Sequence, residues 1–205
     1  SADYGPYGSR RDATVAETLS VPLVATGSPY AIAPGRVRKG DDTAYKVFTP
    51  FYRAWFAHGW RAPATGPLPE LVSAPSHDLP TISGLTFKLP PAGEHAALDR
   101  LATFRENILS DYPESRDRAD TDGTSALSHH LKYGEIHPRT ILAKLGPEDE
   151  VFRKEICWRE FYADVLVHNP QSASESLDSR FDSVMPWATG PEADAAFTAW
   201  TQGKT

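Results

Sequence analysis

Seven of the chain's 18 prolines fall within residues 62–95, and this clustering restricts the fold more than any other feature. The seven are Pro63, Pro67, Pro69, Pro75, Pro80, Pro90 and Pro91. Proline lacks a backbone N–H and clashes with the preceding helical turn, so a helix does not survive this density and a central strand would lose ladder donors. We therefore expect residues 62–95 to be a linker that joins two domains, residues 1–61 and residues 96–205.

The first region, residues 1–61, mixes short apolar runs with turn residues. The run Val21-Pro-Leu-Val-Ala-Thr predicts a short strand, and residues 29–34 a second extended piece. A helix is expected to begin after Thr49-Pro50, with the threonine as its cap and the proline in its first position. Aromatic side chains then recur at helical spacing at Phe48, Phe51, Tyr52, Trp55 and Phe56. This spacing favours a buried helix face.

From Ala96 onward the hydrophobic pattern is helical. The first helix is expected to carry the stripe Leu98, Leu101, Phe104 and Ile108, followed by a polar loop over residues 111–122. Residues 125–133 and 138–145 predict short helices that each end at a glycine. Residues 150–168 predict the strongest helix, ended by Asn169-Pro170, with Phe161, Tyr162, Val165 and Leu166 on one face. Residues 171–205 are mostly polar, with apolar anchors expected at Phe181, Met185, Trp187, Phe197 and Trp200.

Composition excludes several classes of protein. The chain is 40% hydrophobic, as globular domains are, and no apolar run approaches the ~20 residues that span a bilayer, so we expect no membrane partner. The single cysteine, Cys157, permits no internal disulfide and favours a reducing, cytoplasmic location. One cysteine and seven scattered histidines give no metal spacing, so we expect no metal.

Charge leaves a nucleic-acid partner open. The formal net charge is −6, but residues 1–61 carry 8 Lys and Arg against 5 Asp and Glu, whereas residues 171–205 carry 2 against 5. This asymmetry allows a local basic face, which is all that phosphate binding needs.

The segment Gly123-Thr-Ser-Ala-Leu-Ser128 opens a predicted helix and allows two interpretations. Helix N-termini present unpaired N–H groups and a positive partial charge, and the hydroxyls of Thr124, Ser125 and Ser128 add donors, so a phosphate or diphosphate could bind. Threonine or serine before a helix is also a common cap with no ligand at all.

A second group of polar and aromatic residues lies on the helix predicted over residues 150–168. Glu155, Trp158, Arg159 and Tyr162 fall at i, i+3, i+4 and i+7, on one face. This mixture suits a flipped base, with stacking on tryptophan, hydrogen bonds from the carboxylate and arginine on phosphate. The alternative is a Glu155–Arg159 surface ion pair beside core aromatics, which stabilises a protein little.

Five segments follow one another in an order that links these features. They are Tyr7-Gly-Ser-Arg-Arg-Asp12, Tyr45-Lys-Val-Phe-Thr-Pro-Phe51 with Ala54-Trp55, Tyr112 with Arg116 and Asp117 ahead of Thr124–Ser128, Gly134-Glu-Ile136 with Pro138-Arg139, and Glu155 to Tyr162. In this order and spacing they resemble the DNA photolyase/cryptochrome family over most of the chain. The resemblance is to an internal part of the family, most similar to a bacterial class I cyclobutane pyrimidine dimer photolyase.

The resemblance implies a fold class and a domain division. Residues 1–61 would be the C-terminal part of the α/β antenna domain, and residues 96–205 the N-terminal part of a mainly α-helical FAD-binding domain. The α/β remnant and the partial helical domain would be joined by the long Pro-rich linker of residues 62–95. We expect a monomer, as is usual in the family.

The resemblance also assigns FAD as the cofactor, active in its reduced form. Its binding site would be formed by Tyr112, Thr124, Ser125, Ala126, Leu127 and Ser128, with Phe152 near the flavin. The hydroxyls and the helix N-terminus would face the diphosphate. An antenna chromophore, deazaflavin or methenyltetrahydrofolate, would bind as well, and residues 3–8 are similar to deazaflavin-using members.

The partner implied is UV-damaged DNA, and the reaction is light-driven repair of cyclobutane pyrimidine dimers by electron transfer from excited reduced FAD. Arg116 would contact DNA phosphate, and Arg159 and Tyr162 would also bind DNA. The catalytic residues would be Trp158, stacked on the flipped dimer, and Glu155, hydrogen-bonded to pyrimidine carbonyls and N–H groups. The cofactor performs the chemistry, while the protein supplies orientation and electrostatics.

Two alternatives to repair remain open at this point. Glu155 favours cyclobutane dimer repair, because (6-4) photolyases and animal cryptochromes carry Gln there, although some cryptochromes keep Glu. A cryptochrome-like blue-light photoreceptor without repair is the first alternative, and an inactive product of a split or decayed gene is the second. The family's opening strands and everything after Thr205 have no counterpart here, so we expect these 205 residues alone to bind FAD weakly or not at all, to aggregate and to be inactive.

Overall fold

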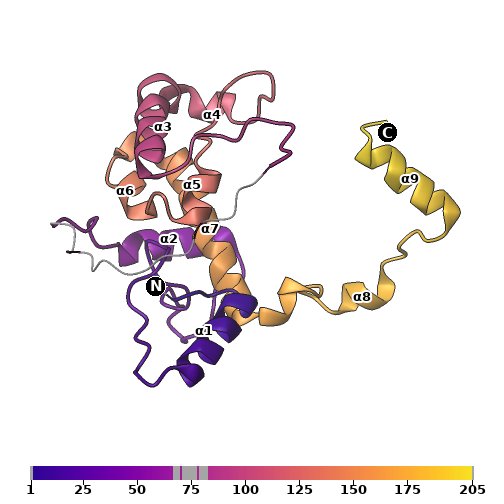
Figure 1. The fold of residues 1–205 in the computed structure, drawn as a ribbon, viewed down its shortest axis with the longest axis horizontal. Helices are drawn as coiled ribbons and strands as arrows, with labels where there is room; N and C mark the ends of the chain where they lie inside the picture. The colour runs from indigo at the N-terminus through magenta and orange to yellow at the C-terminus, as the bar shows by residue number, and fades with distance from the viewer. Residues whose placement is uncertain (1, 67–69, 71–77, 79–82, 205) are drawn as a thin grey trace. The chain divides into compact units, whose positions relative to one another are not determined.

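The computed structural model describes residues 2–66, 70, 78 and 83–204. It divides into two compact units, Ser1–His168 and Asn169–Thr205, which are treated separately below (Figure 1). All regular elements of the described residues are helical, and none is a strand. The helical part of the predicted fold class is therefore confirmed, whereas the α/β character predicted for residues 1–61 is not.

The first unit contains seven α-helices among its described residues. They are α1 Pro6–Thr18, α2 Phe48–His58, α3 Glu94–Asn107, α4 Tyr112–Ser115, α5 Ser128–Tyr133, α6 Pro138–Leu142 and α7 Glu150–His168. Single 3₁₀ turns cover Leu109–Asp111 and Pro147–Asp149. None of the helices in the described part of the chain is long and apolar enough to cross a membrane.

Helix α7 is the longest helix of the first unit, and α2 and α4 both pack against it (Figure 1). Its bounds, Glu150–His168, are those predicted, because Pro170 cannot continue a helix and disfavours helical geometry in the residue before it. Phe161 is buried as expected, but Tyr162 is 63% exposed. The buried stripe instead continues through Phe152, Ile156 and Cys157.

Helix α2 begins at Phe48, two residues before the predicted start. Thr49 is therefore not its cap, and Pro50 lies in the first turn, where the backbone N–H groups have no helical partner and proline costs little. Phe51, Tyr52 and Trp55 are buried, which confirms the predicted buried face. Phe56, also expected on that face, is 52% exposed.

Three boundaries in residues 94–146 differ from prediction. The loop expected over residues 111–122 contains α4, and α5 begins at Ser128 and not at Ser125 because Ala126 has a φ of +50°, which no α-helix contains. Helix α6 ends at Leu142, three residues early. Gly134 does end α5, in the left-handed conformation with φ of 72°.

The strand predicted for Val21–Thr26 is wrong. These residues have no regular structure and their side chains are exposed. A strand is stable only when its N–H and C=O groups pair with a neighbour, and no described residue forms such a ladder with them. The following segment, residues 28–36, is tied to the helices through its backbone.

Two acidic residues of α7 hold residues 31–35 in place. Glu160, only 2% exposed, accepts hydrogen bonds from the backbone N–H groups of Ala31 and of Ile32 (3.1 Å) and from Nε1 of Trp55 (2.7 Å). Burial raises the pKa of Glu160, and these three donors act in the opposite direction. One turn further along, Asp164 accepts from the N–H of Gly35 at 2.6 Å.

The Pro-rich segment contains no helix or strand in residues 62–66, 70, 78 and 83–93, and α3 begins at Glu94. The remainder of the predicted linker lies outside the described residues. The buried face of α3 differs from the predicted apolar stripe. Ala97, Leu101 and Phe104 are buried, whereas Leu98, which was predicted on the stripe, is 39% exposed.

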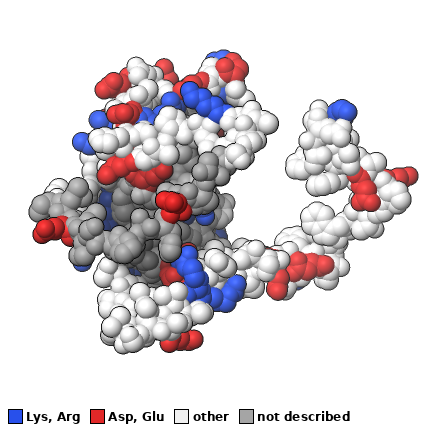
Figure 2. All heavy atoms as spheres, viewed as in Figure 1, with Lys and Arg blue, Asp and Glu red and all other residues white. Residues whose placement is uncertain are grey.

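The second unit contains a 3₁₀ turn, Pro170–Ala173, and helices α8, Arg180–Val184, and α9, Pro191–Thr201. The five apolar side chains expected to anchor it are all exposed, so that prediction is wrong. Helices of five and eleven residues expose too much of their own surface to enclose them. On the face seen in Figure 2, the charged side chains of this unit are mainly acidic, in agreement with the 2 Lys and Arg against 5 Asp and Glu of residues 171–205.

Candidate functional site

A cavity of about 480 Å³ collects most of the predicted site residues. It is lined by Tyr112, Thr124, Ser125, Ala126, Ser128, Leu131, Phe152, Glu155, Ile156 and Arg159. Eight of these ten were expected in a site, and they come from α4, from the segment before α5 and the first residue of α5, and from α7. A larger cavity of about 620 Å³ is lined mainly by residues 25–36 and 58–61 and contains none of the predicted residues. The smaller cavity is therefore the candidate site.

Aromatic rings form one wall of this cavity. Tyr112 and Phe152 meet edge to face with ring centroids 5.2 Å apart. Behind them the fully buried Phe104 lies 4.6 Å from Phe152 and 5.6 Å from Tyr112. Such a three-ring cluster is rigid, because each ring fixes the rotamer of the others. Burial, and then the neighbouring Glu155 carboxylate, raises the pKa of Tyr112.

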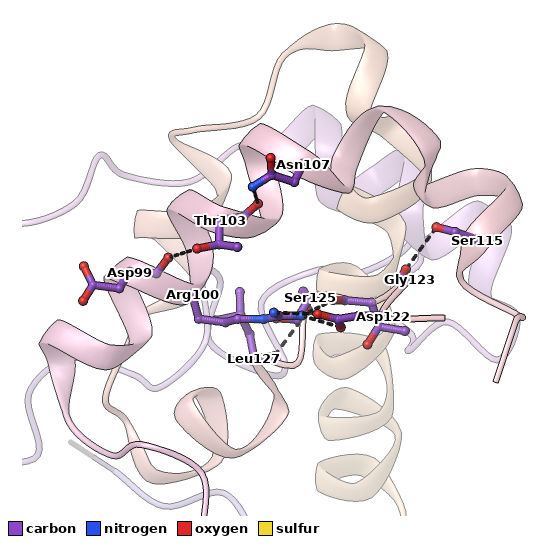
Figure 3. A network of polar contacts seen from close by, with 10 residues as sticks. Asp99, Arg100, Thr103, Asn107, Ser115, Asp122, Gly123, Ser125 and Leu127 are labelled. Carbon is purple, nitrogen blue, oxygen red and sulfur yellow. Dashed lines mark hydrogen bonds and ion pairs between the residues drawn. The ribbon is translucent and has the colours of Figure 1, made fainter. Parts of the chain in front are cut away.

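The segment before α5 forms a second wall, and Arg100 of α3 holds it (Figure 3). The guanidinium donates from Nε to the carbonyl of Ser125 (2.8 Å) and from Nη2 to the carbonyl of Thr124 (2.7 Å). It also forms a two-pronged pair with Asp122, at 3.0 and 2.8 Å. Asp122 lies just before the segment, so Arg100 binds three of the four residues 122–125.

Gly123 is required where this segment passes α4. The Oγ of Ser115 donates to the Gly123 carbonyl at 3.2 Å (Figure 3). A Cβ atom on Gly123 would lie 2.4 Å from the backbone oxygen of Ser115, well inside contact distance. Only glycine allows this approach without a shift of the backbone.

Glu155 projects into the cavity from α7 and is paired with Arg116. Nη1 of Arg116 donates to Oε1 of Glu155 at 2.6 Å, and both side chains are 31% exposed. The guanidinium also lies over the ring of Tyr112, 5.6 Å from its centroid. The hydrogen bond to Glu155 raises the pKa of Arg116.

Arg159 has partners other than the one expected. The alternative Glu155–Arg159 ion pair is absent from the pairs formed by the described residues. Arg159 donates instead to the carbonyls of Pro29 (3.0 Å) and Leu131 (3.4 Å), and it lies over the ring of Tyr30, 4.5 Å from the centroid. It therefore joins the cavity wall to residues 29–30.

Trp158 lies beside the cavity, in an aromatic stack and not in the lining. Its ring stacks on Phe48 of α2 with centroids 3.6 Å apart and planes within 7°. Tyr162 stacks on the same indole at 5.4 Å and 24°, and Phe161 meets it edge to face at 5.7 Å. The three neighbours restrict the indole to one orientation, and the exposed Tyr162 extends the stack to the surface.

The structure separates a few predicted residues from the cavity and adds others. Leu127 is 1% exposed and belongs to the core, so its side chain does not line the site. Leu131 and Ile156 do line it and were not predicted, although both lie one turn from predicted residues. Arg100 was missed as well. Its partners are 22 to 25 residues away and include two backbone carbonyls, which leave no local sequence signal.

Two family models match the chain. The model described as DNA photolyase matches residues 1–71, and the model described as the FAD binding domain of DNA photolyase matches residues 152–205. Together they cover more than half of the chain. The second match includes Phe152, Glu155 and Arg159 of the cavity and Trp158 beside it.

Curated relatives named deoxyribodipyrimidine photo-lyase match nearly the whole chain. A protein of that name from Thermus thermophilus is 39% identical over 211 residues, covering 98% of this chain and 46% of the relative. The Halobacterium salinarum protein is 31% identical over 229 residues, with 99% and 47% covered. The chain therefore spans about half the length of the curated relatives it matches.

A solved structure agrees with these sequence matches. The crystal structure of a bacterial class III photolyase from Agrobacterium tumefaciens superimposes with a TM-score of 0.71 at 27% sequence identity, covering 98% of this chain and 46% of that one. Helical fold, family models and named relatives all lead to the same assignment: the chain belongs to the DNA photolyase family.

Proposed function

We propose that the protein to which this sequence belongs repairs cyclobutane pyrimidine dimers in DNA by light, with reduced FAD as the electron donor. The observation that carries the proposal is the cavity that six of the seven predicted flavin residues line together with Glu155. The names of the curated relatives, deoxyribodipyrimidine photo-lyase, support the same reaction. Their names state no class, so membership of class I stays a prediction.

The residues of the cavity fit FAD. Tyr112 and Phe152 offer apolar ring surfaces, and the hydroxyls of Thr124, Ser125 and Ser128 offer donors for phosphate oxygens. Reduced FAD, when bound and excited by light, supplies the electron that splits the dimer. The protein's own part is to hold the flavin against the rigid aromatic wall and to exclude water from it. The Thr124–Leu127 segment precedes α5, so its backbone and hydroxyl donors, and not a helix N-terminus, would face the diphosphate.

Glu155 is proposed to accept hydrogen bonds from pyrimidine N–H groups. Its pairing with Arg116 holds the carboxylate in one orientation at the cavity wall before any DNA is bound. Arg116 donates from Nη1 to Glu155, its Nε lies 3.6 Å from Oδ1 of Asp117, and its Nη2 is proposed to reach a DNA phosphate. One guanidinium would thus connect the phosphate backbone to the residue that recognises the lesion.

Trp158, Tyr162 and Arg159 are proposed to bind the damaged DNA beside the cavity. The stack of Tyr162 on Trp158 presents aromatic surface of the kind on which an extruded base stacks. Arg159 donates two hydrogen bonds to backbone carbonyls. We therefore propose that it contributes positive charge near the DNA more than a direct contact with a phosphate.

The domain division is proposed as predicted, with residues 1–61 as the end of an α/β antenna domain, residues 62–95 as linker and residues 96–205 as part of the flavin domain. The match of the DNA photolyase model to residues 1–71 supports the first of these. An antenna chromophore, a monomeric state and a cytoplasmic location belong to the same proposal. The cryptochrome-like alternative is favoured by no observation in the site.

A repair assay tests this proposal. The protein as its gene encodes it is mixed with an oligonucleotide that contains one thymine dimer, and dimer loss is measured in the dark and under blue light. Light-dependent loss is expected, and Glu155→Gln should slow it about three- to tenfold, as the loss of one net hydrogen bond implies. Glu150→Gln is the matched control, because Glu150 begins the same helix and, among the described residues, forms its ion pair with the partly exposed Lys154. Flavin-loaded protein that leaves the dimer intact in light would refute the proposal.

A further inference from the structure

Arg100 controls the direction of two peptide groups at the cavity. Its guanidinium binds the carbonyl oxygens of Thr124 and Ser125, the two consecutive residues whose side chains line the second wall (Figure 3). In a trans peptide the C=O of one residue and the N–H of the next point in opposite directions. No peptide bond of the described residues is cis. The N–H groups of Ser125 and Ala126 therefore point away from Arg100.

These two N–H groups are free to bind a ligand. Neither has a hydrogen-bond partner among the residues that the structure describes. Ala126 has a φ of +50°, and a left-handed residue after an ordinary one brings successive N–H groups to one side of the chain. Thr124, Ser125 and Ala126 line the cavity and Arg100 does not, so the side away from Arg100 is the cavity side.

We propose that Arg100 is a positioning residue that turns the Ser125 and Ala126 N–H groups toward the cavity, where they bind the diphosphate of the flavin cofactor. This inference rests on the proposed function and adds to it a residue outside the cavity. Arg100 acts through the backbone and touches no cofactor atom.

The role depends on the shape of the guanidinium more than on its charge. Asp122 forms a two-pronged pair with Arg100, which offsets the positive charge and fixes the plane of the group. Two of its nitrogens then reach the two carbonyls at 2.8 and 2.7 Å. A lysine keeps the charge but cannot bind one carboxylate and two carbonyls in a plane.

The test compares flavins with and without phosphate. Arg100→Gln, Arg100→Lys and the wild-type protein, each in the form that the gene encodes, are freed of cofactor. Dissociation constants are then measured for FAD and for riboflavin, which has the same rings and no phosphate, and pyrophosphate is titrated against bound FAD. The matched control is Arg105→Gln, since Arg105 lies on the same helix and donates to the carbonyl of Lys144, away from the cavity.

The expected result is a selective loss. Both Arg100 variants should bind FAD about 10- to 100-fold more weakly, as the loss of one or two hydrogen bonds to a charged group implies, and the pyrophosphate competition constant should rise by a similar factor. Riboflavin affinity should change less than about twofold, and Arg105→Gln should match the wild type. With FAD bound, amide hydrogen exchange at residues 125–126 should be faster in the Arg100 variants than in the wild type, because the two N–H groups are no longer held against the diphosphate.

Three outcomes would overturn the inference. Equal losses of FAD and riboflavin affinity would make Arg100 a folding residue only, and unchanged FAD affinity would leave it without a role. If riboflavin binds too weakly to measure, an unchanged pyrophosphate competition constant decides against the inference in the same way. Wild-type protein that does not bind FAD, or binds it no more tightly than riboflavin, would instead refute the proposed flavin function itself.

Discussion

Replacement of Glu160 by glutamine should lower the free energy of unfolding of the first unit substantially, without a change in its size or shape. Glu160 is buried and accepts three N–H donors with two oxygens: Ala31 N on Oε1, and Ile32 N and Trp55 Nε1 on Oε2. Glutamine offers one acceptor oxygen, and its amide nitrogen can only donate. Whichever way the amide turns, its nitrogen faces at least one N–H donor.

The magnitude follows from how many donors lose their acceptor. If the amide oxygen takes the Oε2 position, only the Ala31 N–H is left unpaired, and this orientation costs least. A buried unsatisfied donor costs about 1–3 kcal/mol, and the two remaining bonds weaken because a neutral oxygen replaces a carboxylate. We expect a total loss of about 2–4 kcal/mol in the free energy of unfolding. At roughly 2–4 °C per kcal/mol for a chain of this size, the melting temperature should fall about 4–16 °C.

The measurement is thermal and urea unfolding of wild type, Glu160→Gln and the control Glu150→Gln, followed by circular dichroism and by tryptophan fluorescence. In the described part of the chain Glu150 makes an exposed i, i+4 pair with Lys154, so its replacement should cost less than about 0.5 kcal/mol. The fluorescence of the buried Trp55 should also change, because its Nε1 donates to Glu160. Stability of Glu160→Gln within about 0.5 kcal/mol of wild type would refute the view that this carboxylate holds residues 31–32 to α7.

Two further substitutions probe the walls of the site. Gly123→Ala should lower the free energy of unfolding by about 1–3 kcal/mol and reduce the amount of bound FAD, because the added Cβ would lie 2.4 Å from the backbone oxygen of Ser115. The control is Gly40→Ala, which has open space around it and should change neither quantity. Phe48→Ala should weaken binding to dimer-containing DNA about three- to tenfold relative to undamaged DNA, and should have no further effect in a Trp158→Phe background if Phe48 acts only by orienting that indole. Additive losses in the double variant would contradict this role.

Local signals predicted α7 to the residue. Its apolar positions recur at helical spacing over 19 residues, and Asn169-Pro170 ends the helix. Neither the helical spacing nor the end of the helix depends on contacts with residues far away in the sequence. The same holds for the positions of two residues on its face, since Glu155 and Arg159 line the cavity together as their i, i+4 spacing requires. What spacing could not give was the partner of Glu155, because Arg116 lies 39 residues earlier.

Long-range contacts explain the errors before α5. Thr124 and Ser125 have the composition of a helix cap, which predicted a start at Ser125. Arg100 binds the carbonyls of both residues, 24 and 25 positions away, and Ala126 adopts a positive φ. The segment therefore cannot enter the helix until Ser128. Hydrogen bonds from a distant side chain to the backbone decide this boundary, and sequence spacing carries no record of them.

Residues 21–26 were mistaken for a strand for a related reason. Valine and leucine fit a pleated surface, but strand propensity expresses packing against neighbours more than a preference of the backbone itself. The described residues supply no neighbouring strand, and Val21 and Val24 are exposed. The match of residues 1–71 to the DNA photolyase model identifies the family of this region without identifying a sheet within it.

Three pairs of residues on helix α7, each four positions apart, make different contacts. Glu155 and Arg159 face the cavity, Trp158 and Tyr162 stack beside it, and Glu160 with its neighbour one turn on, Asp164, holds residues 31–35. Residues three or four apart share a face of a helix, whereas adjacent residues such as Arg159 and Glu160 do not, so the pair that holds residues 31–35 meets a different surface from the other two pairs, which lie side by side. A Glu160 variant should therefore lose stability while it keeps the preference for phosphate-bearing flavin, and a Glu155 variant should repair more slowly while it keeps stability. If the two effects could not be separated, the two surfaces would form one cooperative structure and not two independent ones.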